Sequence, residues 1–113
     1  MNKAQIIKEA NKVLQIEIQS AKTLKSTFNN SFANVVKTIF DTKGRLIITG
    51  IGKSGHVAKK IASTMSSTGT PSQFVHPSEA SHGDLGNITT NDTILVFSNS
   101  GQSKELNDII NYA

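Results

Sequence analysis

Two short segments carry the residue types that bind phosphate groups. The first is GIGKSG at residues 50–55, which follows a short apolar run. Glycines let a ligand approach the backbone closely, and a helix that begins here offers free N–H groups to an anion. The second is SNSGQS at residues 98–103, whose hydroxyls and amides suit phosphate oxygens. We expect phosphate-binding positions in both segments: Gly52, Ser54, Gly55, Ser98, Ser100, Gln102 and Ser103.

The glycine-rich segment fits the two common nucleotide motifs poorly. The dinucleotide fingerprint expects an acidic residue about 20 positions on to hold the ribose, and the next apolar run ends at Val75 and His76 without one. A Walker motif would require glycine where Ile47 stands. At Ser103, helix capping without any ligand is an equally good interpretation. Two such segments on one sheet nevertheless favour a phosphate ligand.

Hydrophobic periodicity predicts the elements that position these segments. Apolar residues three or four apart indicate helices at residues 7–28 and 32–40, the second capped by Asn30 or Ser31. Apolar runs predict strands at 46–49, 73–75 and 93–97, with helices after the first and third and a helical turn at 78–80. This alternation predicts a doubly wound parallel α/β sheet flanked by helices. With the first strand between the other two, both segments face one crevice.

Composition narrows the class of protein. The 113 residues are 36% hydrophobic and 18% charged, which is typical of a soluble globular domain, and they include no cysteine. No apolar run is long enough to span a bilayer and no secretory signal is recognisable, so we expect a cytoplasmic protein without a membrane partner. Residues 1–60 hold eleven of the twelve Lys and Arg. Because these are scattered singly along helices, we expect a solvated surface and no nucleic-acid partner.

Four segments, in order, resemble a known family. They are GIGKSGH at 50–56, STGTP at 67–71, FVHPSEASHGDLG at 74–86 and SNSGQSKE at 98–105. They resemble the sugar isomerase (SIS) domain of the arabinose-5-phosphate isomerases. The resemblance implies an SIS-type fold, a sugar-phosphate ligand and a homo-oligomer. It also implies interconversion of D-arabinose 5-phosphate and D-ribulose 5-phosphate, which leads to Kdo and lipopolysaccharide, without an organic cofactor.

The resemblance also assigns roles to single residues. An aldose–ketose isomerisation through an enediol needs a base, an acid and a cation or donors for the oxyanion. Lys53 and Glu105 match catalytically important positions of the family, and His82 is placed against the substrate. His76 matches a position that can hold zinc, which we expect to be adventitious or inhibitory. The remaining substrate-binding positions are Gly69, Thr70 and Asp108.

The role of Glu105 has a simpler alternative, and two further residues of these segments have structural interpretations. Glu105 is also a carboxylate of the kind that commonly opens a helix, where the macrodipole favours the charged form. Asp84 is expected either to orient His82 or to serve only in a turn. His56 is expected to pack or cap near the first glycine-rich segment.

The length of the chain departs from the family pattern. We expect an N-terminal helical segment at residues 1–44 and an incomplete SIS domain at 45–113, truncated to about three strands. Members of the family continue with further strands and a pair of regulatory domains, and their pattern includes another catalytic Glu and a His. The expectation is therefore a fragment without substantial isomerase activity. The alternative is a non-catalytic module that binds or senses sugar phosphates.

Overall fold

The computed structural model describes residues 1–101 and 104–113, which form two compact units, residues 1–37 and 38–113. The first unit is helical and contains α1 (Lys3–Thr23), the 3-10 helix η1 (Leu24–Thr27) and the start of α2 (Asn30–Asp41). The side chain of Asn2 accepts a hydrogen bond from the backbone N–H of Gln5 at 2.9 Å, and the Gln5 side chain accepts one from the backbone N–H of Asn2 at 2.7 Å. This reciprocal pair satisfies two of the N–H groups that a helix start leaves open.

The second helix is capped one or two residues before the predicted position. The Asn29 side-chain oxygen accepts a hydrogen bond from the backbone N–H of Phe32 at 3.2 Å. The cap is therefore Asn29, and the expectation of Asn30 or Ser31 was wrong by one or two positions. No residue of α1 is buried, so the apolar stripe from Ile7 to Phe28 is exposed within this unit.

The second unit is built on a three-stranded sheet of β1 (Leu46–Gly50), β2 (Ser72–Phe74) and β3 (Thr93–Phe97). The strand order is β2-β1-β3 and both pairs are parallel, which confirms the predicted central position of the first strand. Register places Gly50 beside Phe97 and Ile48 beside Phe74. The segments that leave the ends of β1 and β3 therefore start at the same level of the sheet.

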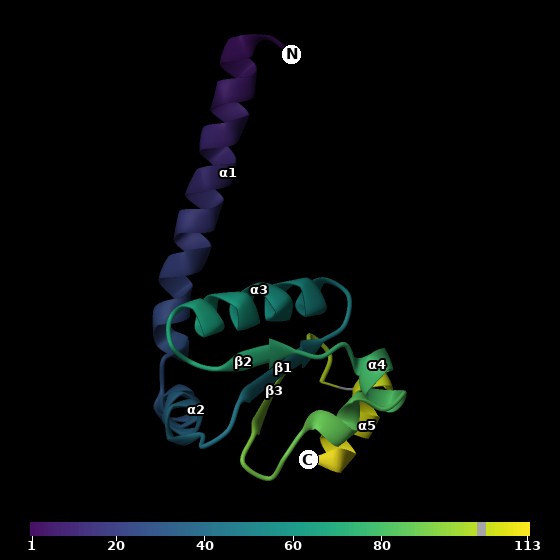
Figure 1. Ribbon diagram of the computed structural model, residues 1–113. Helices are drawn as coiled ribbons and strands as arrows, with labels where there is room; N and C mark the ends of the chain where they lie inside the picture. The colour runs from purple at the N-terminus through teal and green to yellow at the C-terminus, as the bar shows by residue number, and fades with distance from the viewer. Residues whose placement is uncertain (102–103) are drawn as a thin grey trace. The chain divides into compact units, whose positions relative to one another are not determined.

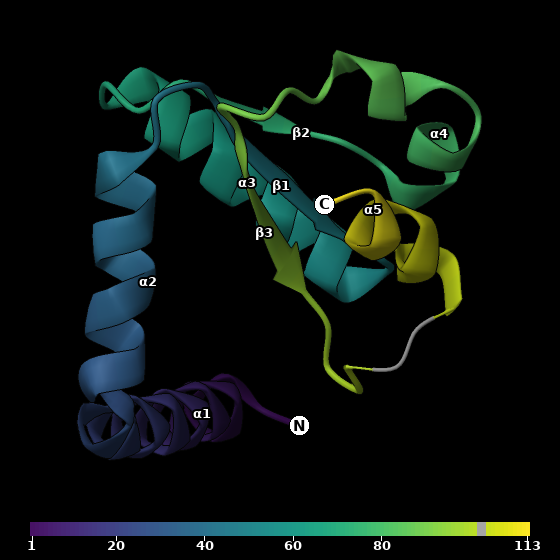
Figure 2. The same ribbon diagram turned by 90° about the horizontal axis from the view of Figure 1, so that it is seen from below.

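Helices cover both faces of this sheet (Figure 1 and Figure 2). On one face, Leu46 and Ile48 pack against Ala58 and Ala62 of α3 (Lys53–Ser67). On the other face, Ile47 packs in a cluster with Val75, Ala80, Ile88 and Ile109. The elements on that second face are α4 (Pro77–Ser81), η2 (Asp84–Asn87), η3 (Lys104–Leu106) and α5 (Asn107–Tyr112).

This arrangement explains the uninterrupted apolar run of the first strand. Side chains alternate between the faces of a strand, and both faces of β1 are covered by helices, so every residue of β1 is buried. The doubly wound parallel fold predicted from the sequence is thereby confirmed. Among the described residues, no helix has the length and apolar content that crossing a bilayer requires.

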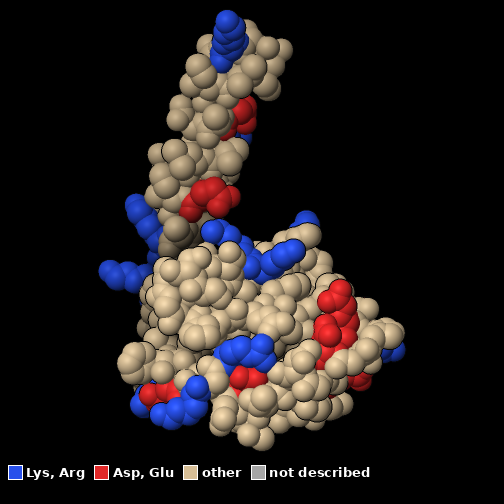
Figure 3. Space-filling view, in the orientation of Figure 1, with Lys and Arg blue, Asp and Glu red and all other residues tan. Residues whose placement is uncertain are grey.

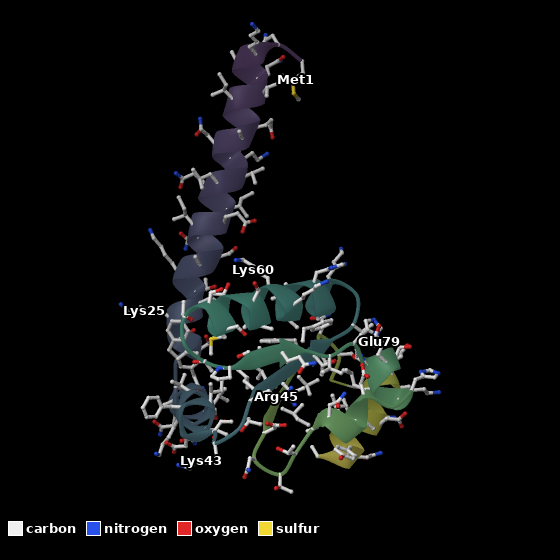
Figure 4. The ribbon with its side chains drawn as sticks, in the orientation of Figure 1. Met1, Lys25, Lys43, Arg45, Lys60 and Glu79 are labelled. Carbon is white, nitrogen blue, oxygen red and sulfur yellow. The ribbon has the colours of Figure 1, made fainter. Side chains whose placement is uncertain are left out.

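A polar cluster fixes the opposite, amino-terminal edge of the sheet. The Asp92 carboxylate accepts hydrogen bonds from the backbone N–H of Arg45 at 2.7 Å and of Thr89 at 2.8 Å. The Arg45 guanidinium lies 3.6 Å from the same carboxylate and donates to the carbonyl of Asn87 at 2.6 Å. The two backbone hydrogen bonds, with the nearby guanidinium, lower the pKa of Asp92. This cluster links the start of β1 to the start of β3; Figure 4 labels Arg45.

Candidate phosphosugar site

The turn from β1 into α3 requires glycine at three positions. A Cβ at Gly55 would lie 2.7 Å from the Gly50 carbonyl oxygen, and one at Gly50 would lie 2.9 Å from the backbone of Ser54. The strand end and the helix start therefore touch backbone to backbone. Gly52 has φ 60° and ψ −128°, a conformation that only glycine adopts readily. An added Cβ there would meet nothing within 4 Å, so the backbone at Gly52 is open to a ligand.

The loop after β3 is held by its own side chains. Ser98 Oγ accepts a hydrogen bond from the backbone N–H of Gly101 at 2.9 Å, and Gly101 has a positive φ of 69°. The Ser98 hydroxyl keeps its own O–H to donate to a ligand. Gln102 and Ser103, which were predicted to bind phosphate, lie outside the described residues.

The two segments border one cleft at the carboxyl edge of the sheet. Its volume is about 170 Å³. Among the predicted positions, Ser54, Ser98 and Ser100 line it; the other lining residues are Ile51, Phe97, Asn99 and Leu106. Pockets that enclose a whole drug-sized ligand measure roughly 300–1,000 Å³. The cleft therefore suits one end of a ligand, such as a phosphate group, better than a whole dinucleotide.

Hydroxyl and backbone donors converge on this cleft. The first helical hydrogen bonds of α3 are donated by the N–H groups of Gly55 and His56, to Ile51 and Gly52. The N–H groups of Lys53 and Ser54 come before these donors in the chain, at the open start of the helix. Such N–H groups at a helix start, with the partial positive charge of the helix end, attract anions.

Two residues that line the cleft, Asn99 and Ile51, were not among the predicted site residues. Both lie inside the two segments that the sequence analysis identified.

The charged candidates lie beside the cleft and not in it. Lys53 is the first residue of α3 and is exposed, next to Ser54. Glu105 is exposed in η3, next to Leu106, whose side chain is buried. Asp108 is exposed in the first turn of α5. None of the three lines the cleft. Lys53 and Glu105 each adjoin a residue that does, Ser54 and Leu106, whereas Asp108 is exposed on α5 and adjoins none.

The side chains of His76 and His82, in the connection after β2, both bond to backbone groups of Ser78. His76 Nδ1 accepts a hydrogen bond from the backbone N–H of Ser78 at 3.1 Å, which caps α4. His82 Nδ1 lies 2.6 Å from the carbonyl oxygen of Ser78. A carbonyl can only accept, so His82 Nδ1 carries the proton and its Nε2 is an acceptor. By the same logic, neutral His76 carries its proton on Nε2. Ser78, and not Asp84, therefore orients His82.

A family model places this architecture among known proteins. The model described as the SIS domain matches residues 38–113, which is more than half of the chain. The chain belongs to the SIS-domain family. The match covers the whole of the second unit, including both segments that border the cleft.

Individual relatives agree with this membership. Arabinose 5-phosphate isomerase KdsD of Yersinia pestis is 50% identical over 98 residues, which are 87% of this chain and 30% of the relative. An uncharacterised protein of Rickettsia prowazekii is 48% identical over 103 residues, 91% of this chain and 32% of the relative. A solved structure of an E. coli CFT073 protein in complex with arabinose 5-phosphate is 38% identical with a TM-score of 0.85, and the match covers 94% of this chain and 56% of that one. The chain thus spans about a third of the length of the curated relatives it matches.

Within this SIS fold, Gly69 and Thr70 lie far from the carboxyl-edge cleft. They precede β2, and the carbonyl of Pro71 accepts a hydrogen bond from Leu46 N–H at 2.8 Å, at the start of β1. They line a different pocket of about 240 Å³ together with Ile39, Phe40, Thr42, Gly44, Leu46 and Pro71. The five residues of β1 separate this pocket from the cleft. One copy of the unit therefore does not bring all the predicted substrate-binding positions together.

The residues around His76 fit a zinc ion poorly. No group of three or more His, Asp or Glu side chains suited to a metal occurs in the described part of the SIS domain or elsewhere in residues 1–101 and 104–113. Zinc sites use three or four protein ligands, and a metal-bound histidine usually donates a hydrogen bond from its other nitrogen. His76 Nδ1 instead accepts one. His56, expected to pack or cap, is exposed and lines a cleft with His76.

The charge distribution agrees with the pattern read from the sequence. Figure 3 shows the basic side chains of the visible face in several separate places, with acidic side chains among them. No single basic surface stands out on that face. The absence of a nucleic-acid partner stays a prediction.

Proposed function

We propose that this chain forms the phosphosugar-binding part of an aldose–ketose isomerase that interconverts D-arabinose 5-phosphate and D-ribulose 5-phosphate. The observation that carries the proposal is the cleft lined by Ser54, Ser98 and Ser100 at the carboxyl edge of an SIS sheet. Its hydroxyl and amide donors fit a phosphate monoester. The relatives named arabinose 5-phosphate isomerase, at 45–50% identity, support the choice of sugar.

The proposed chemistry transfers a proton between adjacent carbons of the open-chain sugar through an enediol. His82 is suited to the role of base or acid, because the Ser78 carbonyl holds Nδ1 in the protonated form and leaves Nε2 as the acceptor. Lys53 at the start of α3 is suited to stabilising the enediolate oxygen or the phosphate. Glu105, which precedes the cleft residue Leu106, is suited to serve as a second proton acceptor, a carboxylate. This chemistry needs no organic cofactor.

A second candidate function is binding without turnover. It is favoured by one observation: Lys53, His82 and Glu105 do not line the cleft that holds the predicted phosphate donors. A protein that senses a sugar phosphate needs the cleft and not these three side chains.

One experiment tests the site and separates the two functions. Isothermal titration calorimetry with arabinose 5-phosphate measures affinity, and a coupled assay of ribulose 5-phosphate measures conversion. We expect Ser98→Ala to weaken binding about tenfold, since a hydrogen bond to a charged group contributes roughly 1.5–3 kcal/mol. Ser63→Ala, an exposed serine on α3, is the matched control and should bind as the unaltered chain does.

Binding with conversion supports the isomerase and contradicts the sensor. Binding without conversion agrees with the sensor and also with an isomerase part that needs the rest of the family's catalytic set. Equal affinity of the Ser98→Ala and Ser63→Ala variants would show that the sugar phosphate does not use the cleft, and both candidates would then be wrong for this site.

We also propose that the chain self-associates through α1. Its stripe of apolar residues is exposed, with Ile7 at 61%, Leu14 at 55% and Phe28 at 61% exposure. An amphipathic helix of this kind gains stability by burying its apolar face against a partner.

The cytoplasmic location expected from the sequence stays a prediction.

A further inference from the structure

A second cleft lies on the other side of the turn between β1 and α3. It measures about 290 Å³ and sits between α3 and the end of β2. The lining residues are Gly50, Gly52, Gly55, His56, Lys59, Phe74 and His76. Three of these side chains carry N–H donors and none is a carboxylate. The cleft lined by Ser54 and Ser98 shares no lining residue with it.

The sequence of α3 builds one wall of this cleft. Gly52, Gly55, His56 and Lys59 are spaced three, four and seven residues apart, so they lie on one face of the helix. At Gly55, α3 packs closely on the end of β1: a Cβ there would lie 2.7 Å from the Gly50 oxygen and 4.0 Å from the Phe74 ring. His56 and Lys59 are exposed and free of the hydrophobic core.

The other wall presents a donor with a fixed orientation. His76 Nδ1 accepts the hydrogen bond from Ser78 N–H, so the outer nitrogen, Nε2, carries a proton and donates. The His76 ring also packs edge to face against Phe74, with centroids 6.5 Å apart and planes at 83°. Two contacts therefore hold the imidazole, and its tautomer is that of a hydrogen-bond donor.

We propose that this cleft binds a second small oxyanion, the phosphate or carboxylate group of a ligand separate from the sugar phosphate. The imidazoles of His56 and His76 supply N–H donors from the two walls, and the ammonium of Lys59 adds positive charge on the α3 wall. Among residues 47–62 and 71–79, the only acidic residue is Glu79, which lies on α4 and does not line the cleft (Figure 4). An oxyanion accepts from such donors, whereas a metal ion would have to displace the proton on His76.

The test is a titration with inorganic phosphate at one fixed pH, monitored by NMR through the ring C2–H signals of His56 and His76. Both signals are expected to shift together with one dissociation constant. Lys59→Ala should weaken that binding about tenfold, because a charged donor is lost. Lys60→Ala is the matched control: it removes the neighbouring lysine, which points away from the sheet in Figure 4 and bonds Thr64 Oγ1 at 3.2 Å.

A third variant keeps this proposal separate from the proposed function. Ser98→Ala should leave the phosphate-induced shifts of His56 and His76 intact, although it weakens sugar-phosphate binding. The proposal is wrong if neither signal moves, if Lys60→Ala weakens binding as much as Lys59→Ala, or if Ser98→Ala removes the shifts. Shifts with zinc chloride but not with phosphate would identify a metal site and would also overturn it. Far-UV circular dichroism of each variant establishes that the chain is folded.

Discussion

At the scale of single residues, Gly52 carries the most specific requirement of the site. Its φ of 60° and ψ of −128° lie in a region that other residues enter only at a cost of about 1–3 kcal/mol. The position is open, so a substitution there meets strain and no clash. Gly52 therefore fixes the course of the backbone in the turn from which α3 begins.

We expect Gly52→Ala to lower the melting temperature of the chain by at least about 4 °C, since about 1 kcal/mol corresponds to such a shift in a domain of this size. Thermal unfolding followed by circular dichroism measures it. Gly86→Ala is the matched control, because Gly86 also has open space around it but no positive φ. Equal melting temperatures for the two variants would contradict the claim that backbone strain, and not packing, fixes glycine at 52.

Residue types and spacing predicted that serines from two separate segments lie close together. Ser54, Ser98 and Ser100 were named from the sequence and share one cleft. The tautomers of His76 and His82 could not be predicted, because both depend on how Ser78 is presented by the short helix α4. Gly69 and Thr70 were named by resemblance, and no local pattern indicates that they lie at the opposite edge of the sheet from these serines.

At the scale of secondary structure, Arg45 and Asp92 join the starts of β1 and β3 at the amino edge of the sheet. The side chain of Asp92 is only 3% exposed and accepts two backbone hydrogen bonds. The sequence indicated only a turn at Asn91 and Asp92. An ion pair across 47 residues leaves no periodic signal, so it could not be predicted without knowing that β1 and β3 are neighbours.

This cluster makes stability depend on pH in a defined direction. Backbone hydrogen bonds, chiefly from Arg45, hold the pKa of Asp92 below its ordinary value of 3.8. A carboxyl with a lowered pKa in the folded state contributes stability above its unfolded pKa, and that stability is lost as the pH falls through the folded pKa. Acid below about pH 4 should therefore weaken the link between β1 and β3.

We expect Asp92→Asn to lower the free energy of unfolding at neutral pH by roughly 1–3 kcal/mol, and with it the urea midpoint, because backbone hydrogen bonds to a charged carboxylate are lost. The difference from the unaltered chain should shrink as the pH falls below 3.8 and the native carboxyl takes up its proton. Urea unfolding at a series of pH values measures both effects. A difference that stays constant down to the lowest pH would contradict this role of Asp92.

The sheet itself was predictable from the sequence. Apolar runs gave three strands, and the central position of β1, needed for a shared crevice, is confirmed by the order β2-β1-β3. Boundaries were less accurate: the second strand is Ser72–Phe74 and not 73–75, and the last helix is divided into η3 and α5. Short polar segments allow such shifts because no hydrophobic period fixes their ends.

At the scale of the whole molecule, two features point to more than one copy. The apolar stripe of α1 has no cover within its own unit, and Gly69 and Thr70 lie away from the cleft that the SIS sheet offers at its carboxyl edge. A second copy is the partner that explains both in the simplest way. Closed symmetric dimers bury the same surface on both chains.

Size-exclusion chromatography with light scattering tests this expectation. We expect a mass of at least twice 12.1 kDa and a shift to the monomer in the double variant Leu14→Gln, Ile18→Gln, since both residues lie on the stripe. Ile16→Gln is the control: Ile16 is as exposed as Leu14, at 56% against 55%, but lies on the opposite side of the helix. A monomeric mass for the unaltered chain, or dissociation by Ile16→Gln alone, would contradict self-association through the stripe.

The central claim is that a phosphosugar binds at the carboxyl edge of the sheet between the two predicted segments. Mapping of backbone amide shifts by NMR during titration with arabinose 5-phosphate tests it most directly. We predict that the largest changes fall on residues 51–54 and 98–101, with small changes at the amino edge around Arg45 and Asp92. Saturating sugar phosphate that leaves both segments unchanged, or that shifts the amino edge instead, would contradict the account.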